Sequence, residues 1–319
     1  MEVTAAKAPK PKKRKSANIG GGYWPYAFLA PYVLCYATFS LFPIIYSFTI
    51  SLTSWQGIGP KEYVWFDNYV RILSNADPYF WKSIINTLIL FLCSTPIALI
   101  LGLVIAVFLF NLGRGRNLLQ TLNFLPYVTT PVAIGLIFGF LFDRTSGTIN
   151  GILQALGLIE EGMYWISVPG TARFVVCLMI IWKNTGYYMM LYLSGLAAVP
   201  AELYEAAKVD GANAPQTFWH VTLPQLKPIT TFLMMTAAIN GLQLFDEPNL
   251  LFSGTSSSKS LIGGPERSCL TAVWYFYDVS FRSSSRLGYG AAIAFCLFAI
   301  IVIMTMISNK ITGRRGAMM

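Results

Sequence analysis

Charged residues are scarce in this sequence. Asp, Glu, Lys and Arg together make up 12% of the 319 residues, whereas they make up about a quarter of an ordinary soluble domain. Hydrophobic residues account for 55%, and the mean hydropathy is +0.55. This composition, with its several long apolar runs, excludes an ordinary soluble domain. It indicates a protein that crosses a membrane several times.

Histidine and paired cysteine are also scarce. His220 is the only histidine, which excludes a histidine-based metal cluster and a Ser-His-Asp set. The five cysteines form no close pair, and four lie inside apolar runs, so neither a disulfide framework nor a zinc site is expected. The sequence contains no P-loop GxxxxGK[ST] and no carboxylate pair at credible spacing. We therefore expect no cofactor, no enzyme activity and no usual ATP site in this chain.

Six apolar runs are each long enough to cross about 30 Å of hydrocarbon as a helix. The first run is too long for a signal-peptide core, so we expect it to remain as an uncleaved span. The sequence predicts an all-α bundle of six transmembrane helices over residues 23–319, after a disordered basic tail over residues 1–22. The runs cover residues 28–52, 84–110, 118–142, 172–193, 229–252 and 290–308.

Basic residues predict the orientation of these spans. With the N-terminus inside, cytoplasmic segments carry more than half of the 23 Lys and Arg residues, including the short Arg114/Arg116 turn and the basic C-terminus. The basic run at residues 10–15 is also typical of nuclear localisation or nucleic-acid binding. Basic residues ahead of a first span are the simpler explanation. We expect both termini in the cytoplasm and no nucleic-acid partner.

The expected outer segments, at about residues 53–83, 143–171 and 253–288, are long and rich in Trp, Tyr, Gly and Ser. Their tryptophans are either anchors at the membrane interface or contacts for an external partner. The sequence leaves both interpretations open for Trp55, Trp65, Trp81 and Trp165.

The longest polar interruption on the expected cytoplasmic side covers about residues 200–228. Pro200 suits the first position of a helix. On that helix Leu203, Ala206 and Ala207 form one small apolar stripe that lets another surface approach closely. Asp210-Gly211 should end the helix, because glycine allows the left-handed turn.

A second short helix is expected directly after this turn. Asn213 is placed to cap it, and Thr222-Leu223-Pro224 is expected to end it ahead of the next span. An amphipathic linker lying on the lipid surface is the alternative interpretation of the whole interruption.

The residue order in this interruption resembles a known motif. Glu-Ala-Ala-x-x-Asp-Gly-Ala at residues 205–212, with Val-Thr-Leu-Pro at residues 221–224, is similar to the EAA loop of ABC importer permeases. In that family the loop docks into a groove on a cytoplasmic ATPase. The resemblance therefore implies that the ATPase-coupling residues are Glu205, Ala206, Ala207, Asp210 and Gly211.

The same resemblance implies an assembly in a bacterial or archaeal cell (inner) membrane. Two cytoplasmic ATP-binding subunits would drive transport, and an extracellular or periplasmic solute-binding protein would deliver the substrate. A second permease subunit would complete the pathway, and a heterodimer is favoured. Membrane lipid surrounds such a bundle.

Further stretches narrow the resemblance to carbohydrate-type permeases, of the maltose-transporter kind. These stretches cover most of the chain after the tail, and they imply a sugar or oligosaccharide substrate. The chain departs from the family pattern at residues 254–260, which lengthen the link to the Gly-Gly-Pro stretch. The stretches include Trp-Lys-Asn-Thr-Gly at residues 182–186, Gly-Gly-Pro at residues 263–265 and Gly-Tyr-Gly-Ala-Ala at residues 288–292.

Polar groups inside spans are costly and usually face a cavity or a partner helix. A neutral sugar is bound by amides and carboxylates, with aromatic rings against its C–H faces. Asn240, Gln243 and Asp246, at i, i+3 and i+6, are predicted to line the substrate pathway, together with Asn184 and Tyr187. Further candidates are Asn86, Asn123, Lys183, Glu247, Tyr127, Trp182, Tyr188 and Phe245.

Alternatives remain at both levels. Hydrogen bonding between helices explains each polar candidate equally well, and Lys183 is a candidate ion-pair partner of Asp246. For the whole chain, the alternatives are an ABC permease for a non-sugar solute and a secondary transporter driven by an ion gradient.

Overall fold

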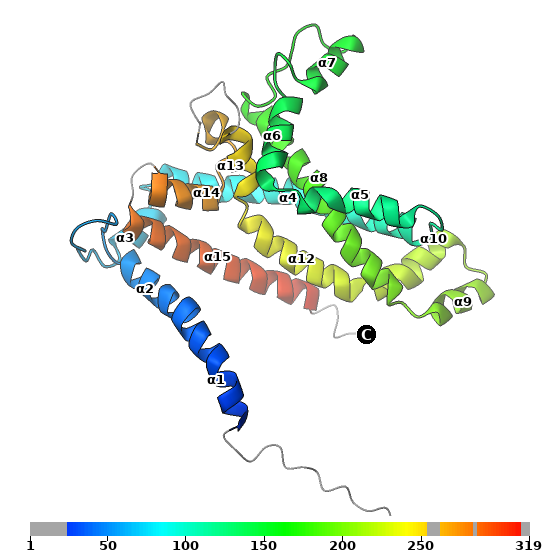
Figure 1. Ribbon diagram of the computed structural model, residues 1–319, viewed down its shortest axis with the longest axis horizontal. Helices are drawn as coiled ribbons and strands as arrows, with labels where there is room; N and C mark the ends of the chain where they lie inside the picture. Colours follow the sequence, from blue (N-terminus) through cyan, green and yellow to red (C-terminus); the bar gives the residue numbers. More distant parts are fainter. Residues whose placement is uncertain (1–23, 254–261, 283–285, 314–319) are drawn as a thin grey trace, which may run out of the picture. The chain divides into compact units, whose positions relative to one another are not determined.

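The computed structural model describes residues 24–253, 262–282 and 286–313, drawn in Figure 1. The predicted tail at residues 1–22 and the lengthened segment at residues 254–260 lie outside the described residues. Every regular element among the described residues is helical, apart from one isolated bridge between Thr53 and Tyr63. The predicted all-α class is therefore confirmed. The chain divides into two units, residues 1–49 and 50–319, and each is described by itself.

The first apolar run forms one long helical segment. It consists of α1 (Trp24–Tyr36), a π-helical turn (Ala37–Leu41) and α2 (Phe42–Ser51). Pro43 has no N–H and would crowd the carbonyl of Phe39 in a regular α-helix. A wider turn just before a proline relieves that conflict. The segment Tyr26–Ser51 is long and apolar enough to cross a membrane, with a mean hydropathy of 1.8.

Three further single helices of the second unit can cross a membrane, namely α4 (Pro78–Phe110), α8 (Pro169–Ala197) and the Leu287–Ile307 part of α15 (Leu287–Gly313). Two bent pairs also qualify, which gives six spans if each pair counts as one. The pairs are α5 (Arg116–Val128) with α6 (Pro131–Leu141), and α12 (Lys227–Leu242) with α13 (Asp246–Ser253). The predicted spans at residues 118–142 and 229–252 are therefore not continuous helices.

The first break follows from a proline. Pro131 disfavours helical backbone in the residue before it, and Thr130 has an extended ψ of 137°. The axes of α5 and α6 consequently differ by 96°.

The second break lies at residues 243–245, where α12 and α13 meet at 41°. Pro248 cannot donate to the carbonyl of Leu244 and would clash with it in a continuous helix. The new helix therefore starts at Asp246, and in its first turn Asn249 N donates to Phe245 O at 3.2 Å.

The centre of the second unit is the long contact between α4 and α8, visible in Figure 1. Its buried side chains include Leu90 and Ala98 on α4 and Val176, Met179 and Met189 on α8. On another side α8 approaches α5, where a Cβ on Gly186 would lie 1.9 Å from the carbonyl oxygen of Asn123. Only glycine fits that contact, which explains the glycine at the end of the stretch at residues 182–186.

Shorter helices lie between the spans or at their ends. They are α3 (Asp67–Leu73), α7 (Thr148–Ala155), α9 (Ala201–Val209), α10 (Ala214–Thr217), a π-helical turn (Phe218–Thr222), α11 (Leu223–Gln225), a 3₁₀ turn (Pro265–Arg267), α14 (Ala272–Tyr277) and a π-helical turn (Asp278–Arg282).

Candidate translocation site and coupling loop

A cavity of about 230 Å³, called here the mid-span cavity, lies near the middle of the spans of the second unit. Its wall on α8 runs from Ile180 to Tyr188, the central third of that helix, and its wall on α4 includes Ser94 and Thr95. The interrupted α12–α13 span supplies another side. Transporter substrate sites lie near the membrane midplane beside discontinuous helices. The position of the cavity fits such a site.

All five predicted pathway residues line the mid-span cavity. Asn184 and Tyr187 come from α8, Asn240 from α12, Gln243 from the break and Asp246 from the first turn of α13. The spacing argument that linked the last three assumed one continuous helix, and that premise is wrong because of the break. Their convergence on one cavity is a finding about their position, and their role in transport stays a prediction.

Lys183 forms its ion pair with Glu247. Its Nζ lies 2.7 Å from Glu247 Oε1, and both side chains are largely buried, at 16% and 10% exposure. The proposed pairing with Asp246 is therefore wrong. Adjacent residues on a helix point about 100° apart, and only the carboxylate of Glu247 faces α8 closely enough. The pair joins α8 to α13 across the break.

Aromatic rings form part of the cavity wall. The rings of Tyr127 and Tyr187 are stacked with centroids 4.6 Å apart and an angle of 16° between their planes. Tyr188 and Phe245 also line the cavity. The wall thus combines flat rings with amides and carboxylates, the groups that bind the C–H faces and hydroxyls of a saccharide.

Three of the other sequence candidates lie elsewhere. Asn86 is buried near the start of α4, where its amide donates to the carbonyl of Arg267 at 2.8 Å and its Oδ1 accepts from Arg173 at 2.9 Å. Among the residues that the structure describes, Asn123 donates only to the carbonyl of Leu119 in its own helix, at 2.8 Å. Trp182 packs against Phe138, with ring centroids 5.6 Å apart. Hydrogen bonding between elements therefore explains Asn86, whereas the bond of Asn123 lies within its own helix.

Sequence reasoning missed the contribution of α4 to the cavity. Phe91, Ser94 and Thr95 line it. The hydroxyl of Ser94 donates to the carbonyl of Leu90 at 2.6 Å, which satisfies its donor. The signal was present as two polar residues directly before Pro96 inside an otherwise apolar run.

The second candidate site is the segment at residues 200–228, called here the coupling loop. Helix α9 starts after Pro200, one residue later than expected. It ends in a left-handed turn at Gly211, with φ of 75°. Ala212 N donates to Ala207 O at 2.9 Å and Gly211 N to Lys208 O at 3.1 Å. These two bonds define a Schellman motif, so the predicted end at Asp210-Gly211 is confirmed.

The predicted stripe of small residues is divided by the fold. Ala206 is exposed and Leu203 is 37% exposed, whereas Ala207 is only 8% exposed and packs within the chain. Glu205, Asp210 and Gly211 are exposed as well. The exposed surface of α9 and its terminal turn therefore contains four of the five predicted coupling residues. The fifth, Ala207, is buried within the chain.

The second helix of the coupling loop begins as predicted. Asn213 Oδ1 accepts from Gln216 N, and Gln216 Oε1 accepts from Asn213 N, both at 2.9 Å, which forms a capping box. Thr222-Leu223-Pro224 does not end it. Pro224 has no backbone N–H, and the π-helical turn before it accommodates the missing hydrogen bond. Helical backbone then continues into α11 and, after Leu226, into α12.

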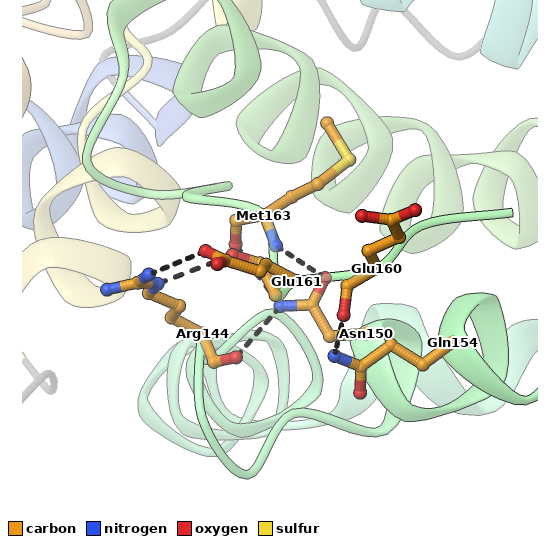
Figure 2. Close-up of polar contacts among 7 residues, drawn as sticks. Arg144, Asn150, Gln154, Glu160, Glu161 and Met163 are labelled. Carbon is orange, nitrogen blue, oxygen red and sulfur yellow. Dashed lines mark hydrogen bonds and ion pairs between the residues drawn. The ribbon is translucent and has the colours of Figure 1, made fainter.

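The third feature is the connection from α6 to α8, called here the α7 segment (residues 143–168). Figure 2 shows the buried side chain of Asn150, on α7, between the residues before this helix and those after it. Its amide donates to the carbonyls of Asp143, Arg144 and Met163 at 3.1–3.2 Å, and its Oδ1 accepts from Met163 N at 3.1 Å and Trp165 Nε1 at 2.8 Å. The side chain of Asn150 therefore joins the residues before α7 to those after it by hydrogen bonds.

The ion pair between Arg144 and Glu161 adds little to the α7 segment by comparison. Arg144 lies 3.7 Å from Glu161 (Figure 2), but both side chains are exposed, and such pairs contribute about 0–1 kcal/mol. Asp143 accepts hydrogen bonds from the backbone N–H of Ser146 and from the hydroxyl and N–H of Thr145. These bonds lower the pKa of its carboxyl to about 2.

The α7 segment and the coupling loop lie at opposite ends of α8. The segment directly precedes Pro169 and the loop follows Ala197, and 29 residues of helix are about 43 Å long. The mid-span cavity lies between them. A polytopic helical bundle with a polar cavity at mid-depth and exposed loops at both ends has the organisation of a membrane transport protein.

Comparison with known proteins gives the family. The chain belongs to the family described as binding-protein-dependent transport system inner membrane component, whose model matches residues 95–315. This confirms the predicted family. The chain is a multi-pass membrane component of a transport system, and the family is one of transport permeases rather than enzymes.

Curated relatives cover most of the chain. It is 34% identical over 279 residues to the lactose transport system permease protein of Rhizobium radiobacter, with 87% of this chain and 90% of the relative covered. It is 34% identical over 293 residues to the arabinooligosaccharides transport system permease protein of Bacillus subtilis (strain 168), with 91% and 88% covered.

A solved structure shares the fold. A chain from the crystal structure of a bacterial ABC transporter involved in the import of the acidic polysaccharide alginate aligns with a TM-score of 0.77. The alignment covers 92% of this chain and 96% of that chain at 22% identity.

Proposed function

We propose that this chain is a permease subunit of a binding-protein-dependent ABC importer for sugars or oligosaccharides, and that residues 23–319 act as one transmembrane permease domain. The observation that carries this proposal is the mid-span cavity, where Asn184, Tyr187, Asn240, Gln243 and Asp246 meet beside a broken span. These residues would form this subunit's half of the substrate pathway.

The chemistry of the cavity favours a sugar over other solutes. Amides and a carboxylate bind hydroxyl groups, and the stacked Tyr127 and Tyr187 rings offer a flat apolar surface to C–H groups. The names of the lactose and arabinooligosaccharide relatives point the same way. An ABC permease for a non-sugar solute is the second candidate. It requires a cognate binding protein that holds no sugar.

The coupling loop would receive the force of ATP hydrolysis. Glu205, Ala206, Asp210 and Gly211 are exposed on α9 and its terminal turn, and small side chains there permit close approach of another protein. We assign this surface to a cytoplasmic ATP-binding subunit, with both chain termini on the same side of the membrane. One chain carries one such loop, so two ATP-binding subunits require a second permease subunit, most simply in a heterodimer.

The external binding protein would dock at the opposite end of the bundle. The α7 segment lies there, held in one shape by Asn150 and presenting exposed Arg144, Tyr164 and Glu161. Arg144 also lies over the ring of Tyr164 at 3.8 Å, so the two present one combined surface.

Uptake of labelled sugar tests this proposal. The chain would be reconstituted in proteoliposomes with its partner permease, the ATP-binding subunits and the sugar-loaded binding protein. Gln243→Ala or Asp246→Ala should lower uptake by about tenfold or more, because each removes hydrogen bonds to the sugar. Asn123→Ala is the matched control, since that amide donates to Leu119 O within its own helix and does not line the cavity. Normal uptake by both cavity variants at normal expression would contradict the assignment.

A further inference from the structure

The mid-span cavity carries an excess of negative charge. Three charged side chains line it, Lys183 from α8 and Asp246 and Glu247 from α13, and the other lining residues on α4, α5, α8 and α12 are uncharged. One positive and two negative groups leave a net charge of −1 among the described lining residues. The sign of this charge bears on which ligands the cavity accepts.

The positive group is already occupied. Lys183 Nζ lies 2.7 Å from Glu247 Oε1, with both side chains largely buried, so it is held by its neighbour. Separating a buried pair leaves an uncompensated charge. A ligand carboxylate that drew Lys183 away would strand Glu247 in the cavity wall. Lys183 is therefore a poor anchor for an anion.

Asp246 is the charge that remains. Its side chain is exposed to the cavity, and within the described part of the chain no cation lies within ion-pair distance of it. It occupies the first turn of α13, where the helix dipole favours a negative group. The Asp246 carboxylate is thus available to accept hydrogen bonds from a ligand, and it repels anions.

We infer that the cargo is a saccharide without negative charge, and that Asp246 excludes acidic sugars from the mid-span cavity. This inference rests on the proposed function and specifies its substrate class. Because Asp246 lines the mid-span cavity, a carboxylate bound beside it would lie roughly 4–8 Å from the Asp246 carboxylate. At that distance like charges in a partly desolvated site repel by enough to lower affinity more than about tenfold. The aligned alginate importer carries an acidic polysaccharide, so a shared fold does not determine this property.

The experiment measures binding to the complete transporter in nanodiscs, without the binding protein, so that only the membrane subunits select. The probes are lactose and arabinotriose, and the derivative of each in which one terminal hydroxymethyl group is oxidised to a carboxylate. Wild type should bind the neutral sugar more than about tenfold tighter than its acidic derivative. In Asp246→Asn, and in Asp246→Ser as a second variant, the ratio should fall to about threefold or less.

Glu62→Gln is the matched control, because it removes one negative charge from an exposed outer loop and should leave the ratio unchanged. Equal or tighter binding of the acidic derivatives by wild type would overturn the inference while leaving a sugar permease in place. A ratio that persists in both Asp246 variants would overturn the role of Asp246. Failure of wild type to bind either neutral sugar or either derivative would contradict the proposed sugar site itself, and the inference with it.

Discussion

Lys183 and Glu247 hold the two sides of the mid-span cavity together. Their pair joins α8 to the first turn of α13, directly after the point where the α12–α13 span is interrupted. The net contribution of a largely buried ion pair to folding stability is small, because desolvation of the two charges offsets their attraction. Removing one partner, however, leaves the other charge buried and unpaired. The stability losses of the two single variants should therefore add up to more than the loss in the double variant.

The first prediction concerns this pair. Lys183→Met or Glu247→Gln alone should destabilise the protein by about 2–3 kcal/mol, because each leaves a charge unpaired in a largely buried site. The double variant should recover part of that loss. Thermal unfolding of the detergent-solubilised protein measures the effect. A double variant whose loss equals the sum of the single losses would argue against the pair.

The second prediction concerns Asp143. Its pKa lies near 2 in the folded protein, below the usual 3.8, because the Ser146 and Thr145 groups bond to the carboxylate. A depressed folded-state pKa contributes stability above about pH 4 that is lost as the pH falls towards 2. Protection of the α7 segment from hydrogen exchange, corrected for intrinsic rates, should therefore decrease over this range. In Asp143→Asn the decrease should be absent, and an unchanged decrease would assign it to another group.

At the scale of elements, the α7 segment depends on one amide. Asn150→Ala removes five hydrogen bonds that join its two sides, at a net cost of about 2–4 kcal/mol to the local structure. We expect rapid hydrogen exchange across residues 143–168 and weaker stimulation by the binding protein, while the spans stay protected.

Gln154→Ala is the control for that variant. Gln154 belongs to the same helix, and its amide makes one long contact of 3.5 Å to Glu160 O (Figure 2). It should leave exchange in the α7 segment nearly unchanged. Equal effects of the two variants on hydrogen exchange would show that the hydrogen bonds of Asn150 do not determine the stability of the α7 segment.

The coupling loop depends on the conformation of Gly211. Proline cannot adopt its φ of 75° and has no N–H for the bond to Lys208 O. Gly211→Pro should therefore uncouple ATP hydrolysis from uptake. Gly211→Ala meets no atom within 4 Å and costs only the left-handed strain, about 1 kcal/mol. It should retain most of the coupling, and the ratio of sugar transported to ATP hydrolysed measures both variants.

The sequence predicted the elements better than their interruptions. Apolar run lengths located the spans, and Asn213 and Gly211 located the ends of helices in the coupling loop. Pro131 and Pro248 were visible, but neighbouring helices often re-satisfy the backbone around a proline in a span. Whether a proline bends or breaks a span is decided by tertiary packing, which a single sequence does not contain.

The candidate site was predicted in composition but not in geometry. Polar residues inside apolar runs identified Asn184, Gln243 and Asp246. The predicted partner of Lys183 was wrong because Asp246 and Glu247 are adjacent in the sequence. The rotation of α13 about its axis decides which of the two carboxylates faces Lys183. The contribution of α4 was missed because Ser94 and Thr95 are common in helices that only pack together.

At the scale of the whole second unit, the coupling loop is joined directly to the mid-span cavity. Its first helix follows α8, and its second leads into α12, which ends beside the cavity at the break. A movement of the loop would therefore reach the cavity from two sides, through two helices that carry Asn184, Tyr187 and Asn240. In the proposed importer, this connection would be the physical basis for ATP-driven access to the site.

Sugar uptake into proteoliposomes with and without internal ATP tests the central claim most directly. The complete assembly with sugar-loaded binding protein should accumulate labelled sugar only when ATP is present on the side of the coupling loop. An ionophore should have no effect. Uptake without ATP that an ionophore abolishes would contradict the account and identify an ion-coupled transporter instead.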